Sequence, residues 1–183
     1  MTLHNRWFSS HNSYMDDFPF AVQGDGAMPV GGVDTVRALF SHIMRFHDLW
    51  NMTCYEQDWL TNEYQMMAIA QSNVSVAEDW ELGMGLAAQD AGLTVQYCMP
   101  LPTDYLISTQ LPAVAQIRVS NDYASDPHTQ WRIGRSAGVE GACIAEVEEG
   151  QCRALSYVLV TEGHGRILES MFQVSLAFAF ALR

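Results

Sequence analysis

The chain has 183 residues, of which 49% are hydrophobic and 16% are charged, and this composition is that of a globular protein rather than a disordered one. Nine basic residues against 21 acidic residues give a net charge of -12, and no stretch of the chain concentrates Lys or Arg. We therefore expect no nucleic-acid partner, because a phosphate backbone would be repelled.

No segment of the sequence has the pattern of a membrane anchor. The longest apolar run, 174–182, is far shorter than the roughly 20 residues that a transmembrane helix needs. The first seven residues do not join a basic segment to an apolar core, so no signal peptide is predicted. We expect no membrane partner, and the compartment stays open.

Metal and nucleotide cofactors also lack a sequence signal. The cysteines show neither CxxC spacing nor the density of a disulfide scaffold, so buried thiols are expected at Cys54, Cys98, Cys143 and Cys152. His42 and His47 are five positions apart, which does not place two metal ligands on one helical face. No GxGxxG or GxxxxGK turn is present, so we predict no cofactor.

Segments of strand and helix character alternate along the chain. A short strand is predicted at 3–9, followed by a polar, glycine-rich loop at 10–32. Asp34 can cap a helix that runs to about Leu49, because apolar residues recur there at helical spacing. The next segment, 52–60, begins as a strand and ends in polar residues that include Asp58. A parallel strand ends in this way where it opens into a functional loop.

The same alternation continues through the middle of the chain. The predicted elements are a helix from Ser75 to a stop at Ala91-Gly92, a strand at 93–99, a short helix at 104–110 and a strand at 113–120. Strands that alternate with helices predict an α/β fold with a parallel sheet. Both an open, doubly wound sheet and a closed (β/α)8 barrel fit this order.

Two aspartates follow predicted strands. Asp58 and Asp122 are 64 positions apart, and a barrel of ~250 residues uses about 31 for each βα unit, so one strand would lie between their strands. A retaining glycosidase needs two carboxyl groups about 5 to 5.5 Å apart at such an edge. Spacing alone leaves the other interpretation open, in which Asp58 caps a helix and Asp122 closes a turn.

Three segments, 96–100, 112–123 and 126–129, resemble the barrel domain of glycoside hydrolase family 36. The similarity is greater to its raffinose-synthase and alkaline α-galactosidase branch, and to related uncharacterised animal proteins with a segment like Tyr-Glu-Gln-Asp-Trp-Leu at 55–60. It covers about residues 3–140, and its most specific part is the Arg-Val-Ser-Asn-Asp-Tyr segment at 118–123.

The resemblance implies a retaining mechanism on α-galactosides, by hydrolysis or by galactosyl transfer. Asp58 falls where the family has the nucleophile of its fourth strand, and Asp122 matches the acid/base aspartate that ends the sixth. Two positions depart from the family pattern. Glu56 replaces a lysine, and its like charge would raise the pKa of Asp58 or repel it unless the side chains diverge. Asn121 replaces an aspartate but still offers an oxygen to a sugar hydroxyl.

Further residues of these segments are candidates for substrate binding. Arg118, Ser120 and Asp122 share one face of an extended strand, which would make a polar row beside Asn121. A structural Arg118 that neutralises nearby carboxylates is the alternative. Trp59 and Tyr123 can stack on a pyranose ring, although aromatic side chains are more often packing residues than ligand contacts.

The predicted elements make about four of the eight units of a barrel. We therefore expect a partial (β/α)8 barrel over residues 1–143, and a C-terminal segment of unclear fold over 144–183. A fragment of this kind exposes strand edges, so self-association through open sheet edges is expected. The alternative function is that of a non-catalytic carbohydrate-binding relative or an inactive fragment of such a barrel.

Overall fold

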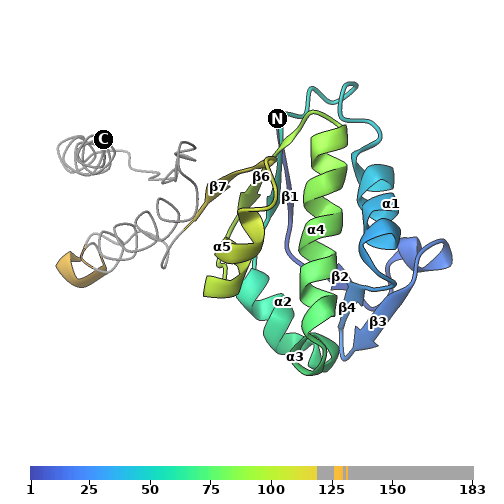
Figure 1. Cartoon of the computed structure of the whole chain (residues 1–183), viewed down its shortest axis with the longest axis horizontal. Coiled ribbons are helices and arrows are strands. Elements are labelled where there is room, and N and C mark those ends of the chain that lie inside the picture. The colour runs from blue at the N-terminus through green and yellow to red at the C-terminus, as the bar shows by residue number, and fades with distance from the viewer. Residues whose placement is uncertain (119–125, 130, 132–183) are drawn as a thin grey trace. The chain divides into compact units, whose positions relative to one another are not determined.

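The computed structural model describes residues 1–118, 126–129 and 131 (Figure 1). The chain divides into two compact units, Met1–Ile117 and Arg118–Arg183. The boundary expected at residue 143 lies outside the described residues. The elements of the first unit are β1 (Thr2–Asn5), β2 (Phe8–Ser9), the 3-10 helix η1 (Ser13–Asp16), β3 (Phe20–Gln23), β4 (Gly26–Pro29), α1 (Val33–Met44), β5 (Cys54–Gln57), α2 (Leu60–Met66), α3 (Ala68–Ser72), α4 (Val74–Asp90), β6 (Thr94–Tyr97), α5 (Pro102–Ser108) and β7 (Val114–Ile117).

The core of the first unit is a four-stranded parallel sheet in the order β1-β5-β6-β7. The predicted α/β class with a parallel sheet is therefore confirmed. The strands follow one another across the sheet in the same order as in the sequence. Because crossovers between parallel strands are right-handed, this order places the crossover helices on one face of the sheet. Figure 1 shows α4 running alongside the strands, with α1 on its other side.

The two faces of this sheet differ in polarity. Tyr55, Val95 and Tyr97 are buried. The ring centroid of Tyr55 lies 5.7 Å from that of Phe40 in α1, so this face of the sheet is turned toward the helices. The opposite face carries a row of polar side chains, one from each strand in register: His4, Glu56, Gln96 and Gln116. The alternation within each strand thus places mainly apolar side chains against the helices and polar side chains on the opposite face.

Close packing of α1 on α4 explains a glycine in a helix interior. A Cβ atom at Gly83 would lie 2.7 Å from Val36 and 2.8 Å from the backbone nitrogen of Arg37. The buried face of α1 carries Val36, Leu39, Phe40 and Met44. The apolar spacing predicted that face, but α1 ends at Met44 rather than at Leu49, and Asp34 lies in its first turn after the N-cap Gly32.

The loop predicted at 10–32 is wrong in its central part. The strands β2, β3 and β4 form a second, antiparallel sheet in the order β2-β4-β3. Gln23 pairs with Gly26, so Gly24-Asp25 is a two-residue hairpin turn, and Gly24 has the positive φ of 58° that such a turn favours. Phe8 joins this sheet to the core through edge contacts with Phe20 and Phe40.

The remaining elements are shifted from their predicted bounds. The strand expected at 3–9 is split between β1 and β2, so its two halves belong to different sheets. The helix predicted from Ser75 is α4, which Asn73 caps through the Ser75 N–H, and it stops at Ala91-Gly92 as expected. Pro102 occupies the first turn of α5, where its missing N–H costs nothing.

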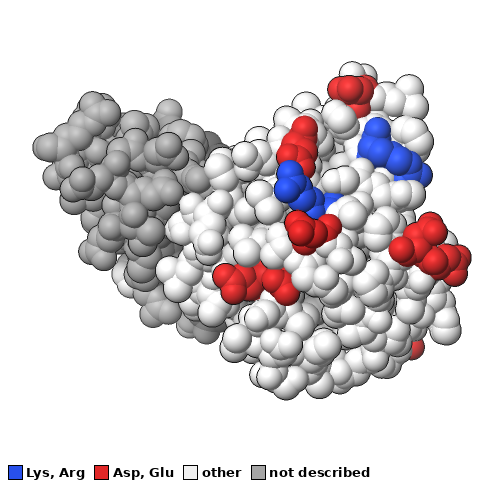
Figure 2. All heavy atoms as spheres, turned by 45° about the vertical axis from the view of Figure 1, so that its right-hand side comes forward, with Lys and Arg blue, Asp and Glu red and all other residues white. Residues whose placement is uncertain are grey.

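Charge on the face shown in Figure 2 is dispersed. Acidic side chains lie there in separate groups, and basic side chains lie among them. Arg37 and Asp90 form a bidentate ion pair, which joins α1 to the end of α4. None of the helices in the described part of the chain is both long and apolar enough to cross a membrane.

Candidate functional site

Asp58 lies directly after β5, at the carboxyl edge of the parallel sheet. Its N–H donates to the Asn5 carbonyl at 2.8 Å, so the ladder with β1 continues to this residue. The next residue, Trp59, has a left-handed backbone with φ 60° and begins α2. This turn ends the strand abruptly and leaves the Asp58 side chain at the position where parallel α/β proteins place functional groups.

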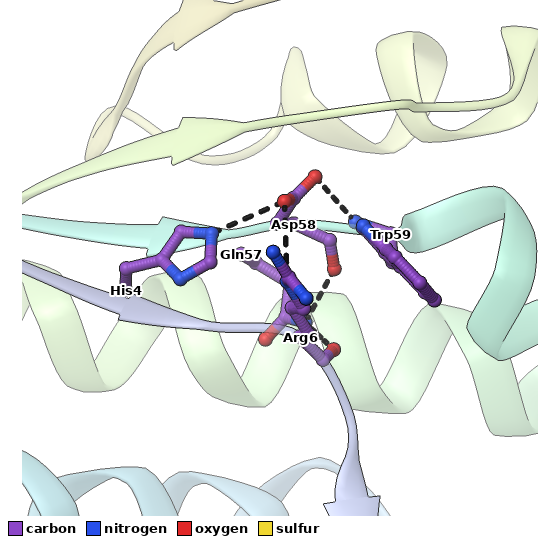
Figure 3. A network of polar contacts seen from close by, with 5 residues as sticks. All are labelled: His4, Arg6, Gln57, Asp58 and Trp59. Carbon is purple, nitrogen blue, oxygen red and sulfur yellow. Dashed lines mark hydrogen bonds and ion pairs between the residues drawn. The ribbon is translucent and has the colours of Figure 1, made fainter.

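Groups on both neighbouring strands hold the Asp58 carboxylate, and Figure 3 shows those that come from the β1 side. His4 Nε2 lies 3.1 Å from Oδ2, and Arg6 Nε lies 4.0 Å from the same oxygen. The other oxygen, Oδ1, accepts the Trp59 N–H at 2.8 Å. The Cys98 thiol, which follows β6, donates a further hydrogen bond to this carboxylate. Only 12% of the Asp58 side chain is exposed.

These donors set the protonation state of Asp58. Burial raises the pKa of Asp58, but hydrogen bonds from Cys98, His4 and the Trp59 N–H, with the charge of His4, together lower it by more, so the pKa lies below the ordinary value. Glu56, two residues earlier on the same strand, is not among the groups that shift this pKa, so the rise expected from its like charge is not observed.

A buried polar chain fixes the ends of β1 and β5 beneath the carboxylate. The Gln57 side chain is fully buried, and its Nε2 donates to the Arg6 carbonyl at 2.6 Å and to the Asp58 carbonyl at 3.1 Å. The Tyr55 hydroxyl donates to Gln57 Oε1 at 3.3 Å. The backbone that carries His4, Arg6 and Asp58 is thereby held from the helix-covered side of the sheet.

Trp59 forms a small aromatic surface beside Asp58. Its ring lies 4.7 Å from that of Trp7 at a tilt of 45°, and the Arg6 guanidinium lies over it at 5.0 Å. The packing interpretation of Trp59 thus describes part of its environment, although the side chain is only half-buried. Carbonyls of Cys98 and Met99 accept the first N–H groups of α2, which secures the turn that carries Trp59.

The other predicted site residues lie on or beyond β7. Arg118 directly follows β7, because the strand predicted at 113–120 ends at Ile117. Arg118 is half-buried and has interaction partners of its own. Ser120, Asn121, Asp122 and Tyr123 lie outside the described residues. β7, the last described strand before Asp122 in the sequence, is separated from β5 by β6, and one intervening strand is what the sequence spacing predicted.

Sequence reasoning missed His4, Arg6 and Cys98. A signal for the first two was present, since His4 and Arg6 are two positions apart and so extend from β1 on one face. Their meeting with Asp58 depends on the pairing of His4 with Glu56, which no local pattern specifies. Cys98 was assigned only as a buried thiol, and its burial is confirmed.

Three other carboxyl groups are buried among the helices. Glu63 of α2 is 2% exposed, and burial raises its pKa to about 8. Glu81 of α4 and Asp104 of α5 are also buried, and burial raises the pKa of both. Their interaction raises the pKa of Glu81 further, whereas the hydrogen bond with Glu81 lowers that of Asp104. Among the described residues, no group of three His, Cys, Asp or Glu side chains could hold a metal ion.

Comparison of the chain with protein-family models, with curated proteins and with solved structures found no match in any of the three.

Proposed function

We propose that this chain is part of a retaining glycosidase-like (β/α)8 barrel that acts on α-galactosides, with Asp58 as nucleophile and Asp122 as acid/base. The observation that carries this proposal is the state of Asp58, which lies at the carboxyl edge of a parallel sheet with its carboxylate held ionised by converging donors. A nucleophile of this class must be ionised when the sugar arrives.

Strand order supports a barrel over a doubly wound sheet. A doubly wound sheet reverses the direction of strand addition at a switch point, and ligands bind there. The four described strands show no such reversal, since β5, β6 and β7 follow β1 in one direction. In a barrel the face opposite the helices is the interior, and here that face carries the polar row of His4, Glu56, Gln96 and Gln116.

The proposed reaction divides the work between the two aspartates. Asp58 attacks the anomeric carbon while Asp122 protonates the leaving oxygen, and the bond to the aglycone breaks. Asp122 then takes a proton from water or from an acceptor hydroxyl, which attacks the galactosyl-enzyme. Water gives hydrolysis and a sugar acceptor gives transfer. In this proposal the sugar is bound by Arg118, Ser120, Asn121, Trp59 and Tyr123.

A binding protein without catalysis is the second candidate. Both oxygens of Asp58 are engaged and its side chain is 12% exposed, which restricts the approach of a sugar carbon. The half-buried Trp59 would still offer an aromatic surface to a pyranose ring. In this case the carboxylate orients hydroxyl groups instead of forming a bond.

The test uses the full chain with an aryl α-galactoside. We expect Asp58→Asn to abolish release of the aryl group, with Asp25→Asn in the exposed turn of the small sheet as the matched control. Asp122→Ala should retain more activity on the aryl substrate than on a disaccharide, and azide should restore part of its turnover. An inactive wild-type chain that binds galactose would favour the binding protein, and one that does neither would refute both functions.

The proposal includes self-association through the sheet edge at β1. Among the described strands β1 pairs with β5 alone, so the backbone groups on its other side are available to another chain. Light scattering of the purified chain should show an assembly larger than one chain. A monodisperse monomer would refute this part of the proposal.

A further inference from the structure

Side chains from three neighbouring strands meet at one carboxylate, which accepts from the two on either side. His4 comes from β1, Asp58 follows β5, and Cys98 follows β6, so Asp58 is the central member of the three. The ladder bonds that align them extend past the strand ends, from Asp58 N–H to Asn5 and from Cys98 N–H to the Gln57 carbonyl, at 2.8 and 2.9 Å. The side chains therefore meet because the backbone register continues to the edge.

We propose that His4 and Cys98 are positioning residues that orient the Asp58 carboxylate for nucleophilic attack, with Arg6 as a weaker third contributor. This inference rests on the proposed function of Asp58 and names the groups on which that function depends. None of the three needs to touch the sugar, because each acts through the carboxylate.

The hydrogen-bonding capacity of each group supports this role. An ionised carboxylate only accepts, so His4 must carry a proton on Nε2 to make the 3.1 Å contact. Cys98 is buried, and its thiol is a weak donor that is not available to solvent. The Trp59 N–H holds Oδ1, so His4 and the Trp59 backbone fix the two oxygens from different directions. Loss of one donor frees the carboxylate to rotate.

The geometry of Arg6 makes it a weaker partner of the Asp58 carboxylate than His4 or Cys98. Its Nε lies 4.0 Å from Oδ2, and 54% of its side chain is exposed, so water screens the pair. Its guanidinium also lies over the Trp59 ring, which is a second role independent of Asp58.

The first experiment measures the titration of the Asp58 carboxylate and does not depend on catalysis. The Asp58 titration is followed by NMR in the full chain with ¹³C-labelled aspartate, and Asp58→Asn assigns its signal. We expect the titration midpoint to rise in His4→Gln and in Cys98→Ala, and to rise least in Arg6→Gln. Cys98→Ser keeps a donor and should stay near the wild type. His11→Gln, at an exposed histidine, and Cys54→Ala, at the neighbouring free cysteine, are the matched controls.

The second experiment measures the reactivity of Asp58 as a nucleophile. A galactose-configured epoxide that alkylates an aspartate nucleophile is followed by mass spectrometry. Labelling of Asp58 should fall about ten- to hundredfold in His4→Gln and Cys98→Ala, because misorientation of a reacting group costs rates of this size. Wild-type chain that is not labelled would refute the proposed function. Unchanged titration midpoints in His4→Gln and Cys98→Ala would refute the positioning role even if Asp58 is labelled.

Discussion

Buried carboxyl groups behave in opposite ways on the two sides of the parallel sheet. Asp58, at the carboxyl edge, has a pKa below its ordinary value, whereas Glu63 and Glu81, among the helices, have raised pKa values. All three residues are less than 9% exposed. Burial therefore does not decide the protonation state by itself.

The difference lies in the number of donors at each site. Asp58 accepts from His4, Cys98 and the Trp59 N–H, which together outweigh desolvation. Oε1 of Glu63 and Oε2 of Glu81 have no hydrogen-bond partner in the structure, so a proton is the cheaper way to remove their charge. Strand ends supply N–H and side-chain donors at one edge, whereas the packed helices expose none to these oxygens.

The largest expected effect is the pH dependence that Glu63 causes. Its pKa rises from 4.5 unfolded to about 8 folded, so the folded state keeps a proton that the unfolded state releases. The free energy of unfolding is then full below pH 4.5 and decreases as the pH rises to about 8. Glu63→Gln should remove this loss, with a gain at pH 9 on the order of 3 kcal/mol over wild type.

Chemical denaturation at pH 5 and at pH 9 measures this effect. Asp79→Asn, at a half-buried position of α4, is the control and should change stability equally at both pH values. A Glu63→Gln chain with the same pH dependence as wild type would show that the carboxyl finds a donor in solution, and the contrast with Asp58 would fail.

A smaller effect is expected from the buried pair of Glu81 and Asp104. Asp104 Oδ2 accepts the Leu101 N–H at 2.6 Å at the start of α5, so Asp104→Ala removes a helix-terminal bond and should cost about 1 to 2 kcal/mol. Glu81 holds the proton of the pair, so Glu81→Gln should be close to neutral at pH 5 and more stable than wild type at pH 9. Equal losses in both variants at pH 5 would contradict this assignment.

The sequence predicts the buried face of a helix better than it predicts where the helix ends. Apolar spacing located the buried face of α1, but the spacing continued to Leu49 although the helix ends at Met44. Phe46, Leu49 and Trp50 are exposed, so the pattern continued without a core to bury it. The hairpin at Gly24-Asp25 did have a local sequence signal, because these two residues suit a two-residue turn. The prediction of a polar loop over the whole segment missed it.

The candidate site was predictable only at Asp58 itself. Its position after a strand is a local feature, whereas its partners come from residues 4 and 98, about 40 to 54 positions away in the chain. Strand register brings them together, and register depends on the whole sheet. The lowered pKa of Asp58 could not be predicted for this reason, since the sequence showed Glu56 on the same strand but not the donors from the neighbouring strands.

Asp58→Asn should change stability with the pH dependence opposite to that of Glu63→Gln. Because its folded pKa is lowered, the contribution of Asp58 is present above its unfolded value of 3.8 and is lost as the pH falls through the folded pKa. We expect a loss of about 1 kcal/mol at pH 7 that disappears in strong acid. Thermal unfolding at pH 7 and pH 3 measures it. A variant more stable than wild type at pH 7 would show that desolvation dominates at this edge as well.

The smallest effect is expected from Arg6→Gln. An exposed guanidinium 4.0 Å from Oδ2 contributes little to stability, so the free energy of unfolding should fall by less than about 0.5 kcal/mol. Added salt should remove the part that is electrostatic, because it screens exposed charges. Arg6→Met keeps much of the packing on Trp59 and separates that contribution from the charge. If Arg6→Gln instead destabilised the chain as much as Asp58→Asn, with no response to salt, the guanidinium would be a full partner of the carboxylate, and the ranking of His4 and Cys98 above it would be wrong.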